Sequence, residues 1–248
     1  VEPPWGDPWR GSPTRVGPVE AKESRGFIAV NRGKRSIRLD LTKPEGVKVV
    51  HRLVSQADVV IMNHRPDVPA KLSIDYDTLS AIKPDLVFCE ITAFGRSGPE
   101  SAKPGYDIIM QARTGLMATN GMIDEGVPRV IRGTPPIDFA AGYAVCQGVL
   151  AALFHRERTG RGQKIETSLL SNALYIQTLP LTYVPSSPSA QSRMVIEDLP
   201  AVREAGLPYP DVNALYQQDD RSPAYRPYYR TFQTKDWIIA VGCLSEPL

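Results

Sequence analysis

The run Ala57-Asp-Val-Val-Ile-Met62, followed at once by Asn63-His-Arg-Pro66, decides the fold class of this 248-residue chain. Its consecutive apolar residues predict a strand that is covered on both faces, as in a parallel sheet. A second run of this kind, Leu86-Val-Phe-Cys-Glu-Ile91, follows a short helical pattern at residues 77–82. The order of strand, loop, helix and strand predicts an α/β fold with right-handed crossovers.

The segments on either side extend this pattern. Upstream, the alternating residues Ser36–Leu41 predict a strand, and Thr42 and Pro44 predict the start of a helix that Thr42 caps. Downstream, helices and a strand are expected again, at residues 104–122 (helix), 138–158 (helix), 164–167 (strand) and 169–179 (helix). The helix at 138–158 is rich in Ala and Gly, which permit close packing, so we expect it in the core.

The expected domain organisation is uneven. Residues 1–180 are interpreted as a large domain, and residues 181–230, with many Pro, Ser, Tyr and Arg and little periodicity, as a linker excursion. Residues 231–248 resume a strand pattern and are interpreted as the start of a smaller domain. The chain has no initial Met and stops just after the apolar run Trp237–Cys243, so we expect further sequence at both ends.

The composition excludes several classes of protein. A net charge of +2 is too balanced for a nucleic-acid-binding surface. The cysteines Cys89, Cys146 and Cys243 are scattered and lack metal-ligand spacing, which is typical of a reduced, cytoplasmic protein without a metal. No apolar run of the sequence suggests a transmembrane segment or a signal peptide.

Candidate binding residues follow the predicted strands, because ligands bind at the carboxyl ends of strands in α/β sheets. This places Asn63–Arg65 and Ala93–Gly98 at a candidate site. His64 is the histidine expected near it, whereas His51 and His155 lie in helical patterns typical of a solvated surface. Basic residues near the strand ends are equally compatible with solvated surface and with binding phosphate groups, namely 31–35, Arg65, Lys71 and Lys103.

Several separated segments, in the same order, resemble class III (CaiB/BaiF-type) CoA-transferases, a family that also contains alpha-methylacyl-CoA racemases. Each segment is weakly specific alone, whereas the ordered set covers most of residues 1–177 and is specific. The segments are Val1–Asp7, Asn31–Ile37, Leu39–Gly46, Ala57–Pro66, Phe94–Pro99, Pro104–Asp107, Ile137–Gly142 and Arg158–Gln163.

The resemblance implies a Rossmann-like large domain, a smaller second domain, and two chains threaded through each other as an interlocked dimer. It also implies that loops at the strand ends bind coenzyme A or an acyl-CoA, with Lys71 at a position that meets a CoA phosphate. The residues implied for CoA binding are Leu39, Asp40, Leu41, Thr42, Asn63, His64, Arg65, Lys71, Pro104, Gly105 and Tyr106.

The catalytic position is where the chain departs from the family. The transferases use an aspartate that forms a mixed anhydride with the acyl group and then a thioester with CoA, and here Ser171 occupies its position. A serine ester cannot replace the anhydride, because an alkoxide is a far poorer leaving group. Four explanations remain open: an offset alignment, a catalytic role for Asp107, a non-catalytic subunit paired with an active homologue, or an inactivated variant.

The sequence therefore predicts an enzyme that moves CoA between an acyl-CoA and a small carboxylic acid, with competence in question at Ser171. One alternative is a non-catalytic CoA-binding subunit of a heterodimer rather than a homodimer. Another is a 2-methylacyl-CoA racemase or epimerase, which Tyr106 disfavours because it occupies the position of the racemase histidine. The sequence does not identify the acyl donor or the acceptor acid.

Overall fold

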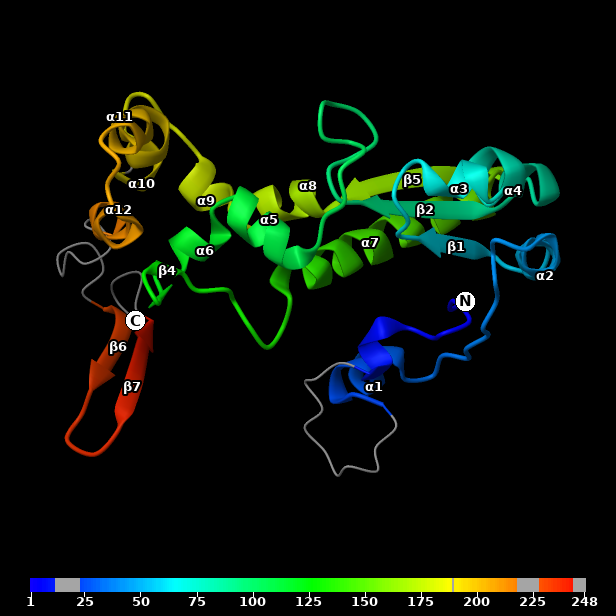
Figure 1. Cartoon of the computed structure of the whole chain (residues 1–248), viewed down its shortest axis with the longest axis horizontal. Helices are drawn as coiled ribbons and strands as arrows, with labels where there is room; N and C mark the ends of the chain where they lie inside the picture. The colour runs from blue at the N-terminus through cyan, green and yellow to red at the C-terminus, as the bar shows by residue number, and fades with distance from the viewer. Residues whose placement is uncertain (12–22, 189, 218–227, 243–248) are drawn as a thin grey trace. The chain divides into compact units, whose positions relative to one another are not determined.

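The computed structural model describes residues 1–11, 23–188, 190–217 and 228–242 (Figure 1). The chain divides into two compact units. The first unit comprises residues 1–104 and 144–167, and the second comprises residues 105–143 and 168–248.

The first unit is built on a three-stranded sheet with the order β1-β2-β5. Its strands are β1 (Val59–Met62), β2 (Val87–Thr92) and β5 (Gln163–Ser168). β1 and β2 are parallel, and Met62 at the carboxyl end of β1 lies opposite Glu90 of β2. The predicted α/β fold with a parallel sheet is thus confirmed, because the apolar runs at 57–62 and 86–91 do form neighbouring strands.

One face of this sheet packs against helices α2 and α4. The core joins Val54 of α2, Met62 of β1, Leu79 of α4 and Phe88 of β2. Figure 1 shows α3 and α4 beside the sheet and α1 near the N-terminus. The helices of this unit are η1 (Pro8–Gly11), α1 (Arg25–Asn31), α2 (Pro44–Val54), α3 (Val68–Lys71) and α4 (Tyr76–Ile82).

Helix α7 (Pro136–Thr159) begins in the second unit and continues into the first. In the first unit it packs against β5, where a Cβ added to Gly148 would lie 3.0 Å from Ile165. Its Arg156 pairs with Asp58, just before β1, at 3.1 Å. Glycine at 148 therefore permits the close approach of helix and strand.

The second unit is mainly helical. Its helices are α5 (Asp107–Arg113), α6 (Leu116–Thr119), α8 (Leu169–Tyr175), α9 (Thr178–Leu181), α10 (Ala190–Arg193), the π-helix η2 (Met194–Asp198), α11 (Leu199–Glu204) and α12 (Tyr209–Tyr216). Two antiparallel hairpins complete it, β3 (Ile123–Asp124) with β4 (Val127–Pro128), and β6 (Tyr229–Gln233) with β7 (Ile238–Gly242). The predicted helix at 104–122 is divided at Gly115, whose φ of +78° ends α5 and begins α6.

Some local predictions were wrong. Residues Ser36–Leu41 form no strand. They pair with the short N-terminal segment around Glu2 through a single bridge, between Arg38 and Glu2. Thr42 does not cap α2, since its hydroxyl bonds to Asp40 instead, although Pro44 does begin the helix. Residues 181–230, interpreted from sequence as a linker excursion, contain helices α10–α12, and their role as a linker stays a prediction.

The prediction that the Ala- and Gly-rich helix lies in the core was also wrong for most of α7. Ile137, Ala141, Val145 and Ala152 are buried, whereas Tyr143, Leu150 and Phe154 are exposed by 71%, 61% and 63%. By length and composition alone this helix could cross a membrane, contrary to the expectation from sequence. Core helices of globular proteins often meet the same two criteria, so this observation alone is weak.

The domain boundaries stay a prediction, and Cys243 lies outside the described residues.

Candidate functional site

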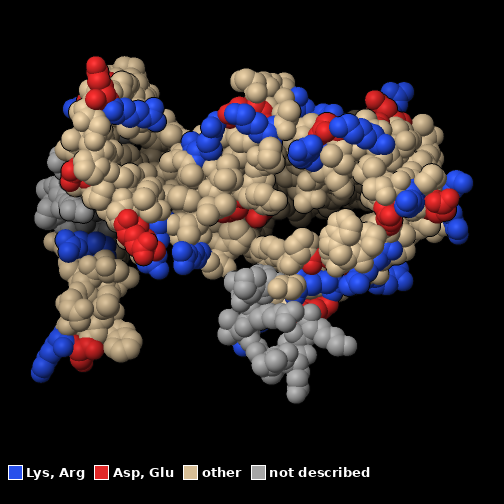
Figure 2. Space-filling view, in the orientation of Figure 1, with Lys and Arg blue, Asp and Glu red and all other residues tan. Residues whose placement is uncertain are grey.

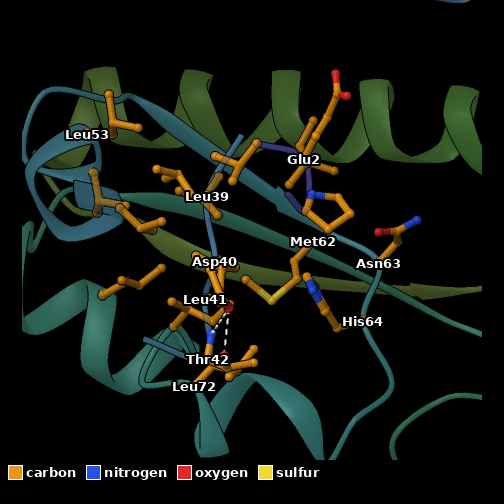
Figure 3. Close-up of a pocket in the computed structure, with 18 of the residues that line it drawn as sticks. Glu2, Leu39, Asp40, Leu41, Thr42, Leu53, Met62, Asn63, His64 and Leu72 are labelled. Atoms are coloured by element: carbon orange, nitrogen blue, oxygen red, sulfur yellow. Dashed lines mark hydrogen bonds between the residues drawn. The ribbon is translucent and has the colours of Figure 1, made fainter. Parts of the chain in front are cut away.

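A cavity of about 580 Å³ lies at the carboxyl end of β1 in the first unit (Figure 3). Five parts of this unit form its wall: the N-terminal residues, the segment before α2, helix α2 itself, strand β1 with the residues on either side of it, and the segment 72–79 that leads into α4. Most of the wall is apolar, contributed by Leu39, Leu41, Val50, Leu53, Val54, Val60, Ile61, Met62, Leu72 and Ile74. An apolar cavity with few polar groups is typical of a site for a ligand with a flat, largely apolar part.

The segment Leu39–Thr42 is held in place by its own hydrogen bonds. The backbone N–H of Leu39 donates to Glu2 O at 2.9 Å. Thr42 donates to the Asp40 carboxylate from its backbone N–H at 3.0 Å and from its hydroxyl at 2.6 Å. These bonds from Thr42 lower the pKa of Asp40. The Asp40 carboxylate is thus occupied within its own turn.

Glycine at position 46 explains how helix α2 approaches this turn. A Cβ built on Gly46 would lie 2.1 Å from the backbone oxygen of Asp40, closer than non-bonded atoms come. Only glycine fits there without a shift of the backbone. Gly46 therefore sets the position of the segment Leu39–Thr42 relative to the start of α2.

The end of β1 contributes Asn63 and His64. Asn63 is exposed, and the His64 ring lies beside the Met62 side chain (Figure 3). The Nδ1 atom of His64 is buried and has no hydrogen-bond partner among the described residues. Burial lowers the pKa of this imidazole, so its neutral form is favoured.

Three of the basic residues expected near the site, Arg65, Lys71 and Lys103, are engaged in surface ion pairs. Lys71 and Arg65 both reach the Asp67 carboxylate, at 2.7 Å and 3.3 Å. The hydrogen bond from Lys71 lowers the pKa of Asp67. Lys103 pairs with Glu100 at 2.7 Å. Solvent screens exposed pairs of this kind, so they contribute little to stability and an anionic ligand could compete for these cations.

The structure brings together six of the residues expected for CoA binding. Leu39, Asp40, Leu41, Thr42, Asn63 and His64 all line the cavity. Arg65 and Lys71 follow in the same unit but do not line it. Pro104 ends the first unit, whereas Gly105 and Tyr106 begin the second. The N-terminal residues 1–5 also line the cavity and had not been expected there; the bridge of Glu2 to Arg38, which places them, has no signal in the sequence.

Asp107 is a buried carboxylate that holds the start of α7. Its Oδ2 accepts hydrogen bonds from the backbone N–H groups of Ile137 at 2.7 Å and Asp138 at 3.1 Å. Its Oδ1 accepts from the Gln111 side chain. A carboxylate that satisfies the free N–H groups of a helix start is well placed for a structural role. This geometry argues against Asp107 as a replacement nucleophile.

Asp138 follows directly at the same helix start. Desolvation by the surrounding atoms, and then the nearby Asp107 carboxylate, raise the pKa of Asp138 to about 6, even though part of its side chain faces solvent. Tyr106, by contrast, is 75% exposed. Asp138 is therefore the carboxyl group of the second unit that is suited to exchange a proton near neutral pH.

Ser171 lies in the first turn of α8 and takes part in a capping box. Its backbone N–H donates to Ser168 Oγ at 3.0 Å, and its hydroxyl donates to Ser168 O at 2.9 Å. Ser168 Oγ in turn donates to Ser171 Oγ at 2.9 Å. These bonds stabilise the helix start. They involve no histidine or carboxylate, so within this described turn no base activates the serine hydroxyl.

Charge does not gather into a single patch on the face shown in Figure 2, where Lys and Arg atoms are interspersed with Asp and Glu. Among the described residues, no group of three or more His, Cys, Asp or Glu side chains is arranged to hold a metal ion.

Comparisons with known proteins agree with this geometry. The family model "CoA-transferase family III" matches residues 1–248. The chain is 44% identical over 144 residues to a succinate–glutarate CoA-transferase of Agrobacterium fabrum, which covers 58% of this chain and 36% of that protein. It is 39% identical over 176 residues to an acetyl-CoA:oxalate CoA-transferase of Acetobacter aceti, which covers 70% of this chain and 44% of that protein.

Solved structures show the same likeness. A CaiB/BaiF family protein from Brucella suis superposes with a TM-score of 0.65 at 31% identity, over 98% of this chain and 57% of that one. Rv3272 from Mycobacterium tuberculosis gives a TM-score of 0.67 at 28% identity, over 98% of this chain and 55% of that one. The matched segments thus cover less than half the length of the two curated relatives above.

Proposed function

Because the chain belongs to CoA-transferase family III, we propose that it binds an acyl-CoA at the carboxyl end of β1 and takes part in moving CoA to a carboxylic acid. The observation that carries the proposal is the cavity of about 580 Å³ lined by Leu39–Thr42, Asn63 and His64. These residues come from two separate segments that the sequence had already linked to CoA. Their convergence on one cavity supports a binding role for both.

The chemistry depends on position 171. A transferase needs a carboxylate that forms a reversible anhydride and then carries CoA as a thioester. Serine offers neither step, and Ser171 is committed to the capping box of α8. An aspartate fits the same place without disturbing the helix, because an acidic side chain in the first turn interacts favourably with the helix dipole.

The experiment is incubation of the chain with succinyl-CoA and a panel of carboxylic acids, followed by mass spectrometry of the CoA thioesters formed. The parent is compared with Ser171→Asp, and Ser187→Asp serves as a control substitution in a turn outside the capping box. We expect little or no exchange by the parent and new acyl-CoA with Ser171→Asp. If the parent itself exchanges CoA at the rate of the variant, the assignment of Ser171 to the catalytic position is wrong.

The alternative of a non-catalytic subunit is supported by the same serine. One relative, 37% identical over 159 residues, is named as the beta subunit of a succinyl-CoA–L-malate CoA-transferase from Chloroflexus aurantiacus. A subunit of this kind retains CoA binding and depends on a homologue for chemistry. CoA binding without exchange, in both the parent and Ser171→Asp, would favour this alternative.

Proton transfer at the α-carbon of an acyl-CoA is the remaining alternative, and Asp138 favours it. A carboxyl group whose pKa is raised to about 6 is a suitable acid or base near neutral pH. Incubation with a 2-methylacyl-CoA in deuterium oxide tests it, because a racemase incorporates deuterium at the α-carbon. The absence of incorporation, with CoA still bound, leaves the transferase proposal in place.

A further inference from the structure

The turn between α6 and β3 contains Asn120-Gly121, the one Asn-Gly pair in the sequence. Asn120 is exposed and follows the last residue of α6, and Gly121 has a φ of +67°, in the left-handed region that favours glycine. An asparagine before glycine is open to spontaneous deamidation, because no side chain on the next residue hinders its backbone nitrogen. The pair is thus a candidate site of chemical modification.

Deamidation begins when the Gly121 nitrogen attacks Cγ of Asn120 and gives up its proton, which passes through solvent to the departing amide nitrogen. A bond forms between the Gly121 nitrogen and Cγ, the bond from Cγ to the amide nitrogen breaks, and ammonia leaves behind a five-membered succinimide ring. Water then opens the ring at either carbonyl carbon and yields aspartate or isoaspartate. Each conversion consumes one water and releases one ammonia.

The folded turn opposes the first of these steps. The Gly121 N–H donates to Ala118 O at 3.0 Å, so the attacking nitrogen is already engaged. The ψ of Asn120 is −17°, a helical value. Ring closure needs Cβ of Asn120 and the Gly121 nitrogen on the same side of the Cα–C bond, and a helical ψ turns them apart. The turn must therefore open locally before it can react.

Helix α12, which lies in the same unit, holds this turn closed. Gln217, at the C-terminal end of α12, donates from Nε2 to Ala118 O at 3.2 Å, so this carbonyl oxygen is shared by Gly121 and Gln217. A Cβ built on Gly121 would lie 2.8 Å from the same Nε2. Asn213, a buried residue one turn earlier in α12, donates from Nδ2 to Gly121 O at 3.4 Å. The helix also packs against β4 (Figure 1).

We propose that Asn120 is a deamidation site and that α12 restrains the reaction by holding residues 118–121 in their closed turn. The inference concerns the chemical durability of the chain and is independent of the proposed binding of CoA. Conversion to isoaspartate adds a carbon to the backbone of the turn and a negative charge at the C-terminal end of α6, where the helix dipole disfavours it. The modified turn therefore no longer fits against α12.

The test follows deamidation of the full chain at mildly alkaline pH by mass mapping. Trypsin cleaves after Arg113 and Arg129 and releases the peptide 114–129, in which Asn120 is the only side-chain amide. The gain in mass from amide to acid, measured over time, gives the rate at this one residue. The folded parent is compared with the parent unfolded in guanidinium chloride and with three folded variants.

The first variant, Gln217→Ala, removes the side-chain contact of α12 with Ala118 O. Gln233→Ala is the matched control, since the Gln233 side chain also donates to backbone oxygens but does so in the hairpin of β6 and β7. Asn120→Gln removes the reactive residue, because a glutamine must close a six-membered ring, which forms more slowly.

We expect the folded parent to deamidate at least about tenfold more slowly than the unfolded parent, since its turn must first open. Gln217→Ala should raise the rate of the folded chain about fivefold, the effect of one lost hydrogen bond. Gln233→Ala should react as the parent does, and the peptide from Asn120→Gln should stay unmodified.

Three results overturn the inference. One is an equal rate in the folded and the unfolded parent, the second is a rate in folded Gln217→Ala no higher than in the parent, and the third is an unfolded parent whose peptide stays unmodified. Guanidinium chloride unfolding of each variant shows that it is folded before the reaction starts. If Gln217→Ala is not, Gln217→Glu takes its place, because it keeps the length of the side chain and removes the donor, and the same comparison of rates decides.

Discussion

Asp107 shows how a carboxylate in a motif linked to catalysis can have a structural purpose. It accepts hydrogen bonds from the backbone N–H groups of Ile137 and Asp138 and from the Gln111 side chain. The start of α7 therefore depends on one side chain from α5. These contacts argue against the second explanation for Ser171, a catalytic role for Asp107. A carboxylate engaged in this way is poorly placed to attack a thioester.

We predict that Asp107→Asn destabilises the chain by about 1–3 kcal/mol, because hydrogen bonds to a charged acceptor are replaced by weaker ones at a buried site. The free energy of unfolding is measured by urea denaturation at neutral pH. Asp77→Asn is the matched control, since Asp77 is an exposed residue in the first turn of α4. Equal effects of the two substitutions would contradict the structural role of Asp107.

Asp138 leads to a prediction about pH. Because its folded-state pKa is raised from 3.8 to about 6, the folded chain binds a proton more tightly than the unfolded chain does between these values. Stability should therefore fall as pH rises from about 3.8 to about 6 and then stay level. Asp138→Asn should remove this loss, so the variant should be more stable than the parent above pH 6 and equal to it below pH 3.8.

Thermal unfolding of both proteins across this pH range gives the measurement. The difference between variant and parent isolates the contribution of Asp138 from that of other carboxyl groups. A difference that does not change with pH would contradict the raised pKa and would remove the support for proton transfer at this residue.

Among the elements, strand β2 and the loop after it are joined by a buried charge network. Glu90 of β2 is 1% exposed. Both of its oxygens accept from Arg96, at 2.5 Å and 2.7 Å, and one also meets Lys164 of β5 at 3.2 Å. Arg96 belongs to the loop at residues 93–104, so the network fixes this loop at the carboxyl end of the sheet.

Removing one partner of a buried ion pair leaves the other without compensation, which often costs about 3–5 kcal/mol. Because Lys164 still contacts Glu90, we expect Arg96→Gln to cost less than this range, about 1–3 kcal/mol. The double variant Glu90→Gln/Arg96→Gln should recover part of the loss, since it no longer buries an unpaired charge. Lys103→Gln, in an exposed pair with Glu100, is the control.

The free energies of unfolding of the single and double variants form a double-mutant cycle. Additive losses would show that the two charges do not interact. Limited proteolysis of the loop gives an independent measurement, because Arg96→Gln should expose residues 93–104 to cleavage before the whole chain unfolds.

The sequence predicted this sheet because each of its strands is a run of apolar or alternating residues between clear turns. β1, β2 and β5 were expected, and so were α4 and α7. The prediction failed where tertiary context decides. Ser36–Leu41 alternates like a strand, yet it meets only the short segment around Glu2, so a single bridge forms. Helices α10, α11 and α12 have four, six and eight residues, which is too short for periodicity to distinguish them from loop.

Part of the candidate site could also be predicted, because it lies next to strands that the sequence identifies. Residues that follow apolar strands, such as Asn63 and His64, could be placed at a sheet edge from sequence alone. The N-terminal residues of the cavity wall could not, because their position depends on a backbone bridge rather than on a pattern. The Glu90–Arg96 network was also missed, since a charge inside a buried strand gives no indication of its partner.

In the whole molecule, α7 presents an unusual surface. Phe139, Tyr143, Cys146, Leu150 and Phe154 are all exposed and recur at intervals of three or four residues, so they lie along one side of the helix. An apolar stripe of this length is typical of a surface that is covered in the assembled protein. The resemblance to the family implied an interlocked dimer, and we expect a second copy of the chain to cover this stripe.

We predict that the chain sediments as a dimer and that Leu150→Glu shifts it towards monomer, because a buried charge would oppose the contact. Cys146 reports on the same surface: maleimide should modify it slowly in the parent and faster in Leu150→Glu, with the buried Cys89 slow in both. Mass mapping assigns each reaction to its cysteine. Rapid modification of Cys146 in a monomeric parent would contradict the dimer.

Binding of the parent to lipid vesicles, lost in Leu150→Glu, would instead indicate that the stripe meets a membrane. The length and composition of α7 leave this alternative open. The two outcomes differ in whether the apolar stripe meets protein or lipid.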